Sequence, residues 1–293
     1  MVEDTAAAIV AGSGRPPAGR SVSSEAQLPP TLTVVIPAWN EAERIEECVE
    51  QVLARLSDQD AEIVVVDDGS SDGTAARCAA WVRAHPAARV RLVRAPHRGK
   101  GAALRAGVAV SRGEVVAFID ADLDVPPEEI ARLLRERATG RLDVVVGSKR
   151  VLAWRQVPRP FGRKVMSLAF SGLVAVLFRL PVRDTQTGVK LFSGPWLRRA
   201  VTYTRIDGFL FDVEILALAA AQGLRMGEAQ VRVVMRRPAS RIGMRDVVHC
   251  LGELAMVPAA LHRARRALPV AGASPRRSAP SRAERVAHAP VGS

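Results

Sequence analysis

The sequence has few aromatic residues and few cysteines, and both shortages limit what the protein can be. Phe, Trp and Tyr make up 4% of its 293 residues. This argues against a protein that binds single-stranded nucleic acid by stacking bases on aromatic rings. Cys48, Cys78 and Cys250 are far apart and form no metal-binding or redox spacing. They predict reduced, buried thiols in a cytoplasmic protein.

No apolar run in the sequence is long enough to cross a membrane. The longest, residues 165–177, contains serine and glycine and is flanked by Arg163, Lys164 and Arg179. A helix needs about 20 apolar residues to span a bilayer. Residues 1–30 also lack the basic start and unbroken apolar stretch of a signal peptide. The sequence therefore predicts a protein without a transmembrane helix.

Composition separates both ends of the chain from its middle. The formal net charge is +12, and residues 263–293 contain seven Arg and one Glu, which is +6 of that total. This segment is rich in Pro, Ala and Ser and has no apolar period, so we predict a basic disordered tail. Residues 1–30 have a similar composition without the charge, and we predict disorder there too. One domain remains, over residues 31–262.

The middle of the chain alternates short apolar runs with stretches of helical period, which predicts βαβ units in a mainly parallel open α/β sheet flanked by helices. Up to about residue 150 we expect one nucleotide-binding half. It has predicted strands over 32–36, 62–66, 90–93, 115–119 and 143–146, and predicted helices over 41–56, 72–84, 102–111 and 127–137. The second half is less regular. We predict helices over 163–178, 211–221 and 244–261 and strands over 189–192 and 228–235.

Polar clusters follow three of the predicted strands. They are Pro37 with Asn40 and Glu41, Asp67 with Asp68, and Asp120 with Asp122 and Asp124. Because the carboxyl ends of parallel strands face one crevice, we expect these side chains to meet there. Acids packed this closely repel one another unless a cation joins them. Mg²⁺ or Mn²⁺, shared with the phosphates of a substrate, is the natural partner.

Each cluster also has a simpler interpretation. The acids of residues 120–124 could cap the helix predicted from Pro127, and the acids before Gly69 could form a plain Asp-Gly turn. The loop Arg98–Gly101 offers two cations and free backbone amides to an anion at a helix N-terminus, or it is a flexible basic loop. Neither a Walker motif nor G-x-G-x-x-G occurs, which removes the commonest NTPase and dehydrogenase classes.

Four segments, taken in order, resemble glycosyltransferase family 2, whose members are inverting enzymes with the GT-A fold. They are Val35–Glu41, Val66–Thr74, Arg98–Gly101 and Asp120–Asp122. Four later segments resemble the polyprenyl-phosphate glycosyltransferases, with dolichyl-phosphate β-glucosyltransferases the nearest and dolichyl-phosphate mannose synthases next. They are Gly147–Arg150, Arg163–Ser167, Arg183–Phe192 and Phe211–Glu214. The resemblance covers about residues 32–250 and implies that the second half binds an acceptor.

The resemblance implies a nucleotide-sugar site in which Asp67 and Asp68 hold the base and ribose. Asp120 and Asp122 would bind Mg²⁺ or Mn²⁺ through the diphosphate. Mannose synthases often carry Gln at the position of Asp124, and we expect Asp124 to reach the metal as well. The full set implied for this site is Pro37, Asn40, Glu41, Asp67, Asp68, Lys100, Asp120, Ala121, Asp122 and Gln186.

The resemblance also implies an acceptor site with cations around a lipid phosphate. Its residues would be Lys149 or Arg150, with Arg163, Ser167 and Lys190. The catalytic residues would be Asp122, Arg163 and Asp212. Asp212 matches a base in relatives that use hydroxyl acceptors, and here it would orient the sugar, with Glu214 nearby. Because a phosphate acceptor is already an anion, it needs cations to hold it in line more than it needs a general base.

These roles imply metal-dependent, inverting transfer of a hexose, with glucose first, from a nucleoside-diphosphate sugar to polyprenyl phosphate. UDP-glucose and GDP-mannose both stay open as donors, and so does a soluble or glycan acceptor. A non-catalytic protein that binds a nucleotide sugar or nucleic acid is the remaining alternative, and the intact acidic set argues against it. The sequence does not predict an oligomeric state.

Membrane contact is expected at the cytoplasmic face, in a peripheral arrangement. The apolar segment 165–178 has cationic flanks, which favours a helix lying in the membrane interface, although it could instead be a core helix. The basic tail could bind anionic lipid headgroups or have no such role.

Overall fold

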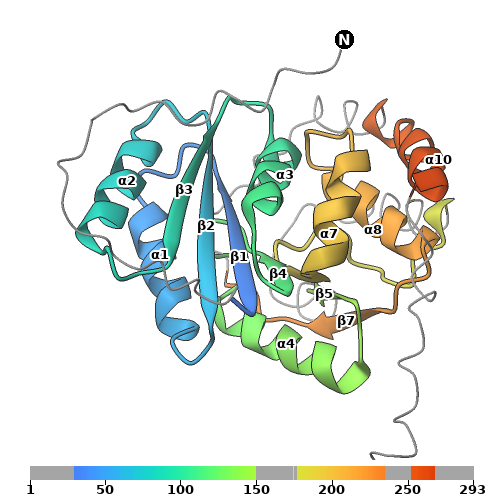
Figure 1. Ribbon diagram of the computed structural model, residues 1–293, viewed down its shortest axis with the longest axis horizontal. Helices are drawn as coiled ribbons and strands as arrows, with labels where there is room; N and C mark the ends of the chain where they lie inside the picture. Colours follow the sequence, from blue (N-terminus) through green and yellow to red (C-terminus); the bar gives the residue numbers. More distant parts are fainter. Residues whose placement is uncertain (1–29, 150–173, 175–176, 235–251, 268–293) are drawn as a thin grey trace, which may run out of the picture.

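The computed structural model describes residues 30–149, 174, 177–234 and 252–267 (Figure 1). Within these ranges seven strands form one sheet, with helices on both of its faces. The strands are β1 (Leu32–Ala38), β2 (Ala61–Asp68), β3 (Val90–Ala95), β4 (Val115–Phe118), β5 (Val144–Ser148), β6 (Lys190–Ser193) and β7 (Met226–Gln230). The helices are α1 (Ile45–Arg55), α2 (Thr74–Ala84), α3 (Lys100–Val110), α4 (Glu128–Gly140), α7 (Gly194–Ala200), α8 (Phe211–Ala221) and α10 (Val257–Ala267), with a 3-10 turn at Val201–Tyr203.

The sheet has the strand order β3-β2-β1-β4-β6-β5-β7. β1 pairs in parallel with β2 and β4, and β5 pairs in parallel with β7. β6 is antiparallel to both of its neighbours, β4 and β5. β1, β2 and β5 are short runs rich in Val and Ile that are buried on both faces, as expected for strands covered by helices on each side. The mainly parallel sheet predicted from the sequence is confirmed.

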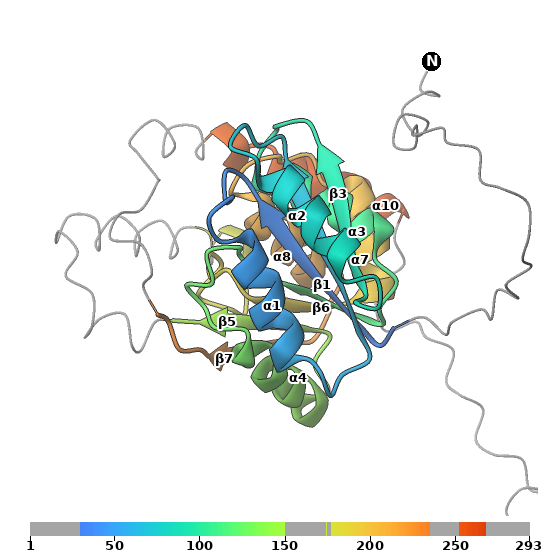
Figure 2. The same cartoon turned by 90° about the vertical axis from the view of Figure 1, so that its left-hand side faces the viewer.

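Two apolar clusters lie on opposite faces of the sheet. Because successive side chains of a strand point to opposite faces, Val34 and Ile36 of β1 join one cluster and Val35 joins the other. The first cluster includes α1, α2 and α4, and the second includes α3, α7, α8 and α10. Figure 2 views the molecule from the side of α1 and α2. The result is three layers, in which the carboxyl ends of β1, β2 and β4 lie at the same side of the sheet.

Both strands that precede the predicted nucleotide motifs run further than the sequence suggested. β1 continues through Pro37 to Ala38, although we expected Pro37 to end it. β1 is paired with β4 only up to Val35, so Pro37 lies beyond the part of the strand that has two neighbours. β2 continues to Asp68, which places Asp67 and Asp68 in the strand instead of in the turn before Gly69.

The second half agrees with the prediction in part. The helix predicted over 211–221 matches α8, but β7 begins at Met226 and ends at Gln230, earlier than predicted. α7 and the 3-10 turn after it were not predicted. α10 runs to Ala267, past the boundary expected at residue 262. None of the helices in the described ranges is long and apolar enough to cross a membrane.

Candidate active site

The three polar clusters meet at one edge of the sheet, as predicted. β1 lies between β2 and β4, and its last residue, Ala38, is opposite Asp67 of β2. Asp120 follows β4, whose last residue pairs with Val35. The loops after these three strands therefore leave the sheet side by side, where open α/β sheets bind ligands.

The loop after β1 is joined to the loop after β2 by hydrogen bonds. Asn40 has a φ of 53°, a left-handed conformation that Asn tolerates better than most residues. Its side-chain oxygen accepts a hydrogen bond from Ser71 N at 2.9 Å. The Glu41 backbone N donates to Thr74 Oγ1 at 2.8 Å. Next to this junction is a hollow of about 510 Å³, lined by residues 40–44, Asp72 and Arg77.

Asp67 and Asp68 are both buried, but they do different things. Asp68 accepts hydrogen bonds from the backbone amides of Arg98 at 3.0 Å and Gly99 at 2.9 Å, and its Oδ2 lies 2.9 Å from His97 Nδ1. Its carboxylate is thus committed to the loop before α3. Asp67 Oδ1, in contrast, is buried without a hydrogen-bond partner among the described residues. Asp67 therefore has an oxygen left for a ligand, whereas Asp68 is largely used within the protein. The role predicted for both acids at the base and ribose stays a prediction.

Three of the four backbone amides in the loop Arg98–Gly101 already donate to protein acceptors, which limits the prediction that this loop offers free amides to an anion. Arg98 N and Gly99 N donate to Asp68, and Gly101 N donates to the carbonyl oxygen of Asp207 at 2.7 Å. Protein acceptors therefore occupy the N-terminus of α3. What this loop contributes to the crevice is the side chain of Lys100, the first residue of the helix.

Lys100 belongs to a chain of alternating charges that runs into the core. Its Nζ lies 2.7 Å from Asp120 Oδ1 and 3.7 Å from Asp212 Oδ2, and Asp212 Oδ1 lies 3.0 Å from Lys190 Nζ. Burial opposes the charge on Lys100, but the carboxylates of Asp120 and Asp212 raise its pKa. Burial lowers the pKa of Lys190, and Asp212 offsets part of that shift. Because Asp212 is buried between two lysines, it suits positioning them better than accepting a proton.

Lys190 was predicted to grip the acceptor phosphate, and the structure contradicts this. Its side chain is 1% exposed, and besides the ion pair with Asp212 its Nζ donates to the carbonyl oxygen of Thr187 at 2.5 Å. Glu214 is likewise fully buried, and its carboxylate accepts hydrogen bonds from the backbone amides of Arg205 and Ile206 at 3.0 Å. Neither side chain faces a ligand.

Asp120 and Asp122 fit a divalent cation held together with a diphosphate. Burial raises the pKa of the Asp122 carboxyl, and the nearby charge of Asp120 raises it further, a repulsion that a cation would relieve. Between Asp122 and Asp124, Leu123 has a φ of 52°, a strained conformation for a buried leucine. Within the described ranges no group of three or more His, Cys, Asp or Glu side chains could hold a metal ion. The predicted three-carboxylate site that included Asp124 is therefore not supported, and two carboxylates with substrate phosphates remain as the ligand set.

Residues 183–188 bring further polar groups beside the acids. The Asp184 carboxylate accepts a hydrogen bond from the backbone amide of Lys149 at 3.0 Å, which ties this segment to the end of β5. Side-chain atoms of Thr185, Gln186 and Thr187 are buried without hydrogen-bond partners in the part of the chain described. A Cβ at Gly188 would lie 2.8 Å from Asp120 Cγ. Gln186 thus belongs to a segment that contacts Asp120 through Gly188, and its role in binding the sugar stays a prediction.

Arg150, Arg163 and Ser167, which we predicted to bind the acceptor, lie outside the described residues. Lys149, which was predicted to bind the acceptor together with them, is described and is half-buried directly after β5. The sequence analysis did not identify three residues that connect distant segments here, namely Asp184, Asp207 and Gly188. Their contacts involve the backbone and leave no local pattern in the sequence. Only the contact of Asp207 had a visible sign, which is the pair of glycines at 99 and 101.

Comparison with known proteins shows which sequences and folds this chain resembles. A dolichyl-phosphate β-glucosyltransferase from Drosophila melanogaster is 32% identical over 220 residues, which are 69% of this chain and 66% of that protein. The human protein of the same name is 29% identical over 202 residues, covering 64% and 62% of the two chains. The chain thus spans slightly less than two thirds of the length of these relatives.

Solved structures of glucosyl-3-phosphoglycerate synthase from Mycobacterium tuberculosis share the fold. The complex with Mn²⁺, UDP-glucose and phosphoglyceric acid has a TM-score of 0.55 at 25% identity, covering 80% of this chain and 79% of that one. Another crystal structure of the enzyme has a TM-score of 0.54 at 26% identity, covering 77% and 81%. The predicted GT-A fold is confirmed.

A model of the family described as glycosyl transferase family 2 matches residues 33–192, which are more than half of the chain. This region contains the ends of β1, β2 and β4 with their polar loops, and also Lys100, Gln186 and Lys190. The chain belongs to glycosyl transferase family 2.

Proposed function

We propose that the protein transfers glucose from UDP-glucose to a polyprenyl phosphate with inversion at the anomeric carbon. The observation that carries the proposal is the ion pair of Lys100 with Asp120 at the open edge of the sheet. It places a cation beside the acids that would hold a metal and a diphosphate. The relatives named dolichyl-phosphate β-glucosyltransferases support glucose as the sugar and a lipid phosphate as the acceptor.

Asp120 and Asp122 would hold Mg²⁺ or Mn²⁺ at the donor diphosphate. When bound, the metal would neutralise charge that develops on the leaving diphosphate. The M. tuberculosis synthase binds Mn²⁺ together with UDP-glucose, which supports the same ligand pair here. Asp67, with its unpartnered buried oxygen, would accept a hydrogen bond from the nucleoside.

Lys100 would add a second positive charge at the donor. Its ammonium group is held by Asp120 and Asp212 and is 19% exposed, so it would meet an incoming phosphate with little reorganisation. Preorganised charge of this kind is what stabilises a leaving group as it becomes negative. Asp212 and Lys190 keep Lys100 in place and, on this proposal, do not touch the substrate.

The acceptor phosphate would bind at the end of β5, next to the sugar. Lys149 is there, and Asp184 holds its backbone amide. Arg150, Arg163 and Ser167, from the segment that follows, would complete the phosphate site. Thr185, Gln186 and Thr187 have buried polar atoms without partners among the described residues, and Gln186 would bind hydroxyl groups of the sugar.

Peripheral contact with the cytoplasmic face of a membrane is part of the proposal, because a polyprenyl chain lies in the bilayer. Flotation of the full-length protein with anionic and neutral liposomes tests it. Binding to neither, alongside transfer to detergent-solubilised lipid phosphate, would remove the membrane contact without removing the activity.

The function is tested by offering two labelled donors, UDP-glucose and GDP-mannose, against two acceptors, polyprenyl phosphate and 3-phosphoglycerate, with Mg²⁺ or Mn²⁺ present. We expect label from UDP-glucose alone in the organic phase. If label from GDP-mannose enters the organic phase instead, the transferred sugar is mannose and the lipid phosphate is still the acceptor.

A soluble phosphorylated acceptor is the second candidate. It is favoured by the M. tuberculosis synthase, which binds phosphoglyceric acid and shares the fold over 80% of this chain. Both acceptors carry a phosphate that Lys149 and its neighbours could bind. Transfer to 3-phosphoglycerate with none to polyprenyl phosphate would establish this alternative.

A further inference from the structure

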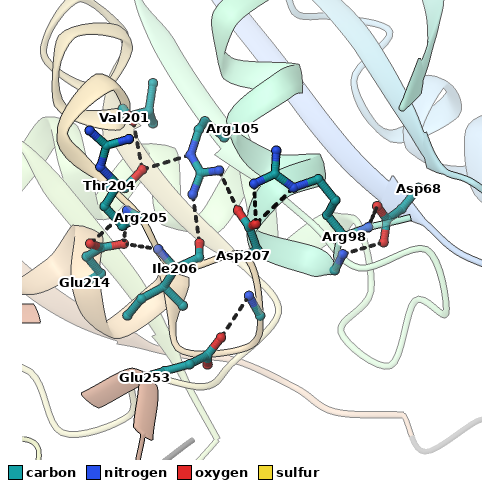
Figure 3. Close-up of polar contacts among 12 residues, drawn as sticks. Asp68, Arg98, Arg105, Val201, Thr204, Arg205, Ile206, Asp207, Glu214 and Glu253 are labelled. Carbon is teal, nitrogen blue, oxygen red and sulfur yellow. Dashed lines mark hydrogen bonds and ion pairs between the residues drawn. The ribbon is translucent and has the colours of Figure 1, made fainter. Parts of the chain in front are cut away.

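A loop of the acceptor half, residues 204–208, contacts the N-terminus of α3 in the nucleotide half (Figure 3). The carbonyl oxygen of Asp207 accepts hydrogen bonds from the backbone amides of Gly101 at 2.7 Å and Ala102 at 3.1 Å. Amides at the start of a helix have no partner within the helix and commonly bind an anion. Here a segment about a hundred residues away in the sequence satisfies them.

The Asp207 carboxylate strengthens this contact with two ion pairs. Its Oδ2 lies 2.6 Å from Arg98 Nη2, and its Oδ1 lies 2.7 Å from Arg105 Nη1. Arg105 also donates to the carbonyl oxygen of Ile206 at 2.8 Å. Burial opposes the charge on Asp207, but hydrogen bonds from Arg105 and Arg98 lower its pKa overall. One side chain therefore pairs with an arginine on each side of Lys100.

The glycines around Lys100 are needed for the same contact. A Cβ at Gly99 would lie 2.7 Å from the carbonyl oxygen of Asp207, and one at Gly101 would lie 2.7 Å from that of Ile206. Gly99 also has a φ of 118°, which side-chain-bearing residues rarely adopt. Both segments therefore contribute to the close approach. The glycines at 99 and 101 leave room for it, and Asp207 makes the contacts from the other segment.

The far side of the loop is anchored to the acceptor half. Glu214 of α8 accepts hydrogen bonds from the amides of Arg205 and Ile206, and Glu253 accepts one from the amide of Gly208 at 3.2 Å. α8 also carries Asp212, which lies 3.7 Å from Lys100 Nζ. α8 therefore reaches Lys100 twice, directly through Asp212 and through the loop that Glu214 holds.

We propose that Asp207 is a positioning residue for Lys100. Asp68 holds the backbone just before Lys100. The carbonyl oxygen of Asp207 holds the backbone just after it, and the Asp207 carboxylate fixes that carbonyl in place by pairing with Arg98 and Arg105. Together these contacts fix the direction in which the lysine leaves the helix. The inference rests on the proposed function, because it takes the donor diphosphate as the ligand that Lys100 meets. It assigns to the acceptor half a direct part in shaping the donor site.

A double-mutant cycle tests this assignment. The affinity for UDP in the presence of Mn²⁺ is measured by calorimetry for the wild type, Asp207→Asn, Lys100→Met and the double variant. Asp207→Asn should weaken UDP binding roughly fivefold, within the range of coupling between residues that share a network. Lys100→Met should weaken it more. The double variant should bind like Lys100→Met alone if Asp207 acts on the ligand through Lys100.

Asp143→Asn is the matched control. Asp143 also accepts a hydrogen bond from a backbone amide, that of Arg225 at 3.0 Å, and pairs with the same arginine's side chain at 3.3 Å, but at an exposed edge of the sheet. It should lower thermal stability without changing the affinity for UDP. Asp207→Glu, which keeps the charge, serves as a second variant if Asp207→Asn does not fold, and it should show the same lack of additivity.

The inference would be overturned if Asp207→Asn bound UDP as tightly as the wild type. It would also be overturned if the double variant lost as much affinity as the two single variants together. Either result, in a wild type that transfers glucose, leaves the proposed function standing. A wild type that binds no UDP with Mn²⁺ would instead refute the proposed function and, with it, this role for Asp207.

Discussion

The ammonium group of Lys100 lies 2.7 Å from the carboxylate of Asp120. Lys100 begins α3, whereas Asp120 follows β4, so the pair connects a helix N-terminus with a strand end. The chain has four lysines among its 42 basic residues, and all four lie in segments assigned to the site. A compact ammonium group can pair with two carboxylates without the fixed planar geometry that a guanidinium imposes. Two of the four lysines, Lys100 and Lys190, form the charge chain through Asp212.

Replacing single carboxylates should show that Asp122 contributes more to activity than Asp124. Asp122→Asn should reduce glucosyl transfer by about a hundredfold or more, the size of effect seen when a group that stabilises developing charge is removed. Asp124→Asn is the control and should cost much less, because the structure does not group Asp124 with the other two acids. Steady-state kinetics at several Mn²⁺ concentrations measure both. Equal losses would restore the three-carboxylate site.

Lys190 should matter for stability. Lys190→Met leaves the buried carboxylate of Asp212 without its nearest cation, which should cost about 3–5 kcal/mol of unfolding free energy. Arg225→Met removes an exposed ion pair with Asp143 and should cost under about 1 kcal/mol. Urea denaturation of both variants gives the two values. A small loss for Lys190→Met would mean that the pair with Asp212 contributes little.

Gly188 should be intolerant of a side chain. In Gly188→Ala the new methyl group would meet the Asp120 carboxylate, 2.8 Å from its Cγ, and force it to move. We expect UDP binding in the presence of Mn²⁺ to weaken about tenfold, since small displacements of a catalytic group are costly. Gly252→Ala has open space around it and should bind UDP normally. Calorimetry compares the two variants, and unchanged affinity in Gly188→Ala would show that the carboxylate can shift without consequence.

Asp207 should make stability depend on pH in acid. Its pKa in the folded protein lies below the ordinary value of 3.8, so below that pH the unfolded chain binds more protons than the folded one. Its stabilising contribution is therefore fully present above pH 3.8 and is lost as the pH falls through the folded pKa. The difference in unfolding free energy between the wild type and Asp207→Asn should be constant from pH 5 to 7 and shrink below 3.8. A difference that stays constant in acid would contradict the ion pairs with Arg98 and Arg105.

Much of the donor edge could be predicted because its information is local. Asp120 and Asp122 follow a short apolar strand, and the order of strands and helices places strand ends together. The partners of individual groups could not be predicted in this way. Asp67 and Asp68 are adjacent in sequence, but alternate residues of a strand face opposite sides of the sheet. The extension of β2 to Asp68 therefore gives the two carboxylates different surroundings: Asp68 binds the loop before α3, and Asp67 keeps an oxygen without a partner among the described residues.

The acceptor half was harder to predict for a related reason. Lys190 lies in a segment rich in polar residues, and its pattern gives no sign that Asp212 accompanies it into the core. Asp207 acts on Lys100 through its carbonyl oxygen and its carboxylate, which contact a segment about a hundred residues away, and no local pattern in the sequence indicates this. The glycines on either side of Lys100 were visible in the sequence, but they suit an approaching phosphate and an approaching loop equally well.

The most direct test of the account is to isolate the product made from UDP-glucose and polyprenyl phosphate and to determine its anomeric configuration by NMR. We expect a lipid-linked β-glucosyl phosphate, formed only with a divalent cation and lost in Asp122→Asn. An α-linked product would contradict inversion. The absence of any glucosyl lipid, with UDP-glucose still bound, would contradict the acceptor assigned to the end of β5.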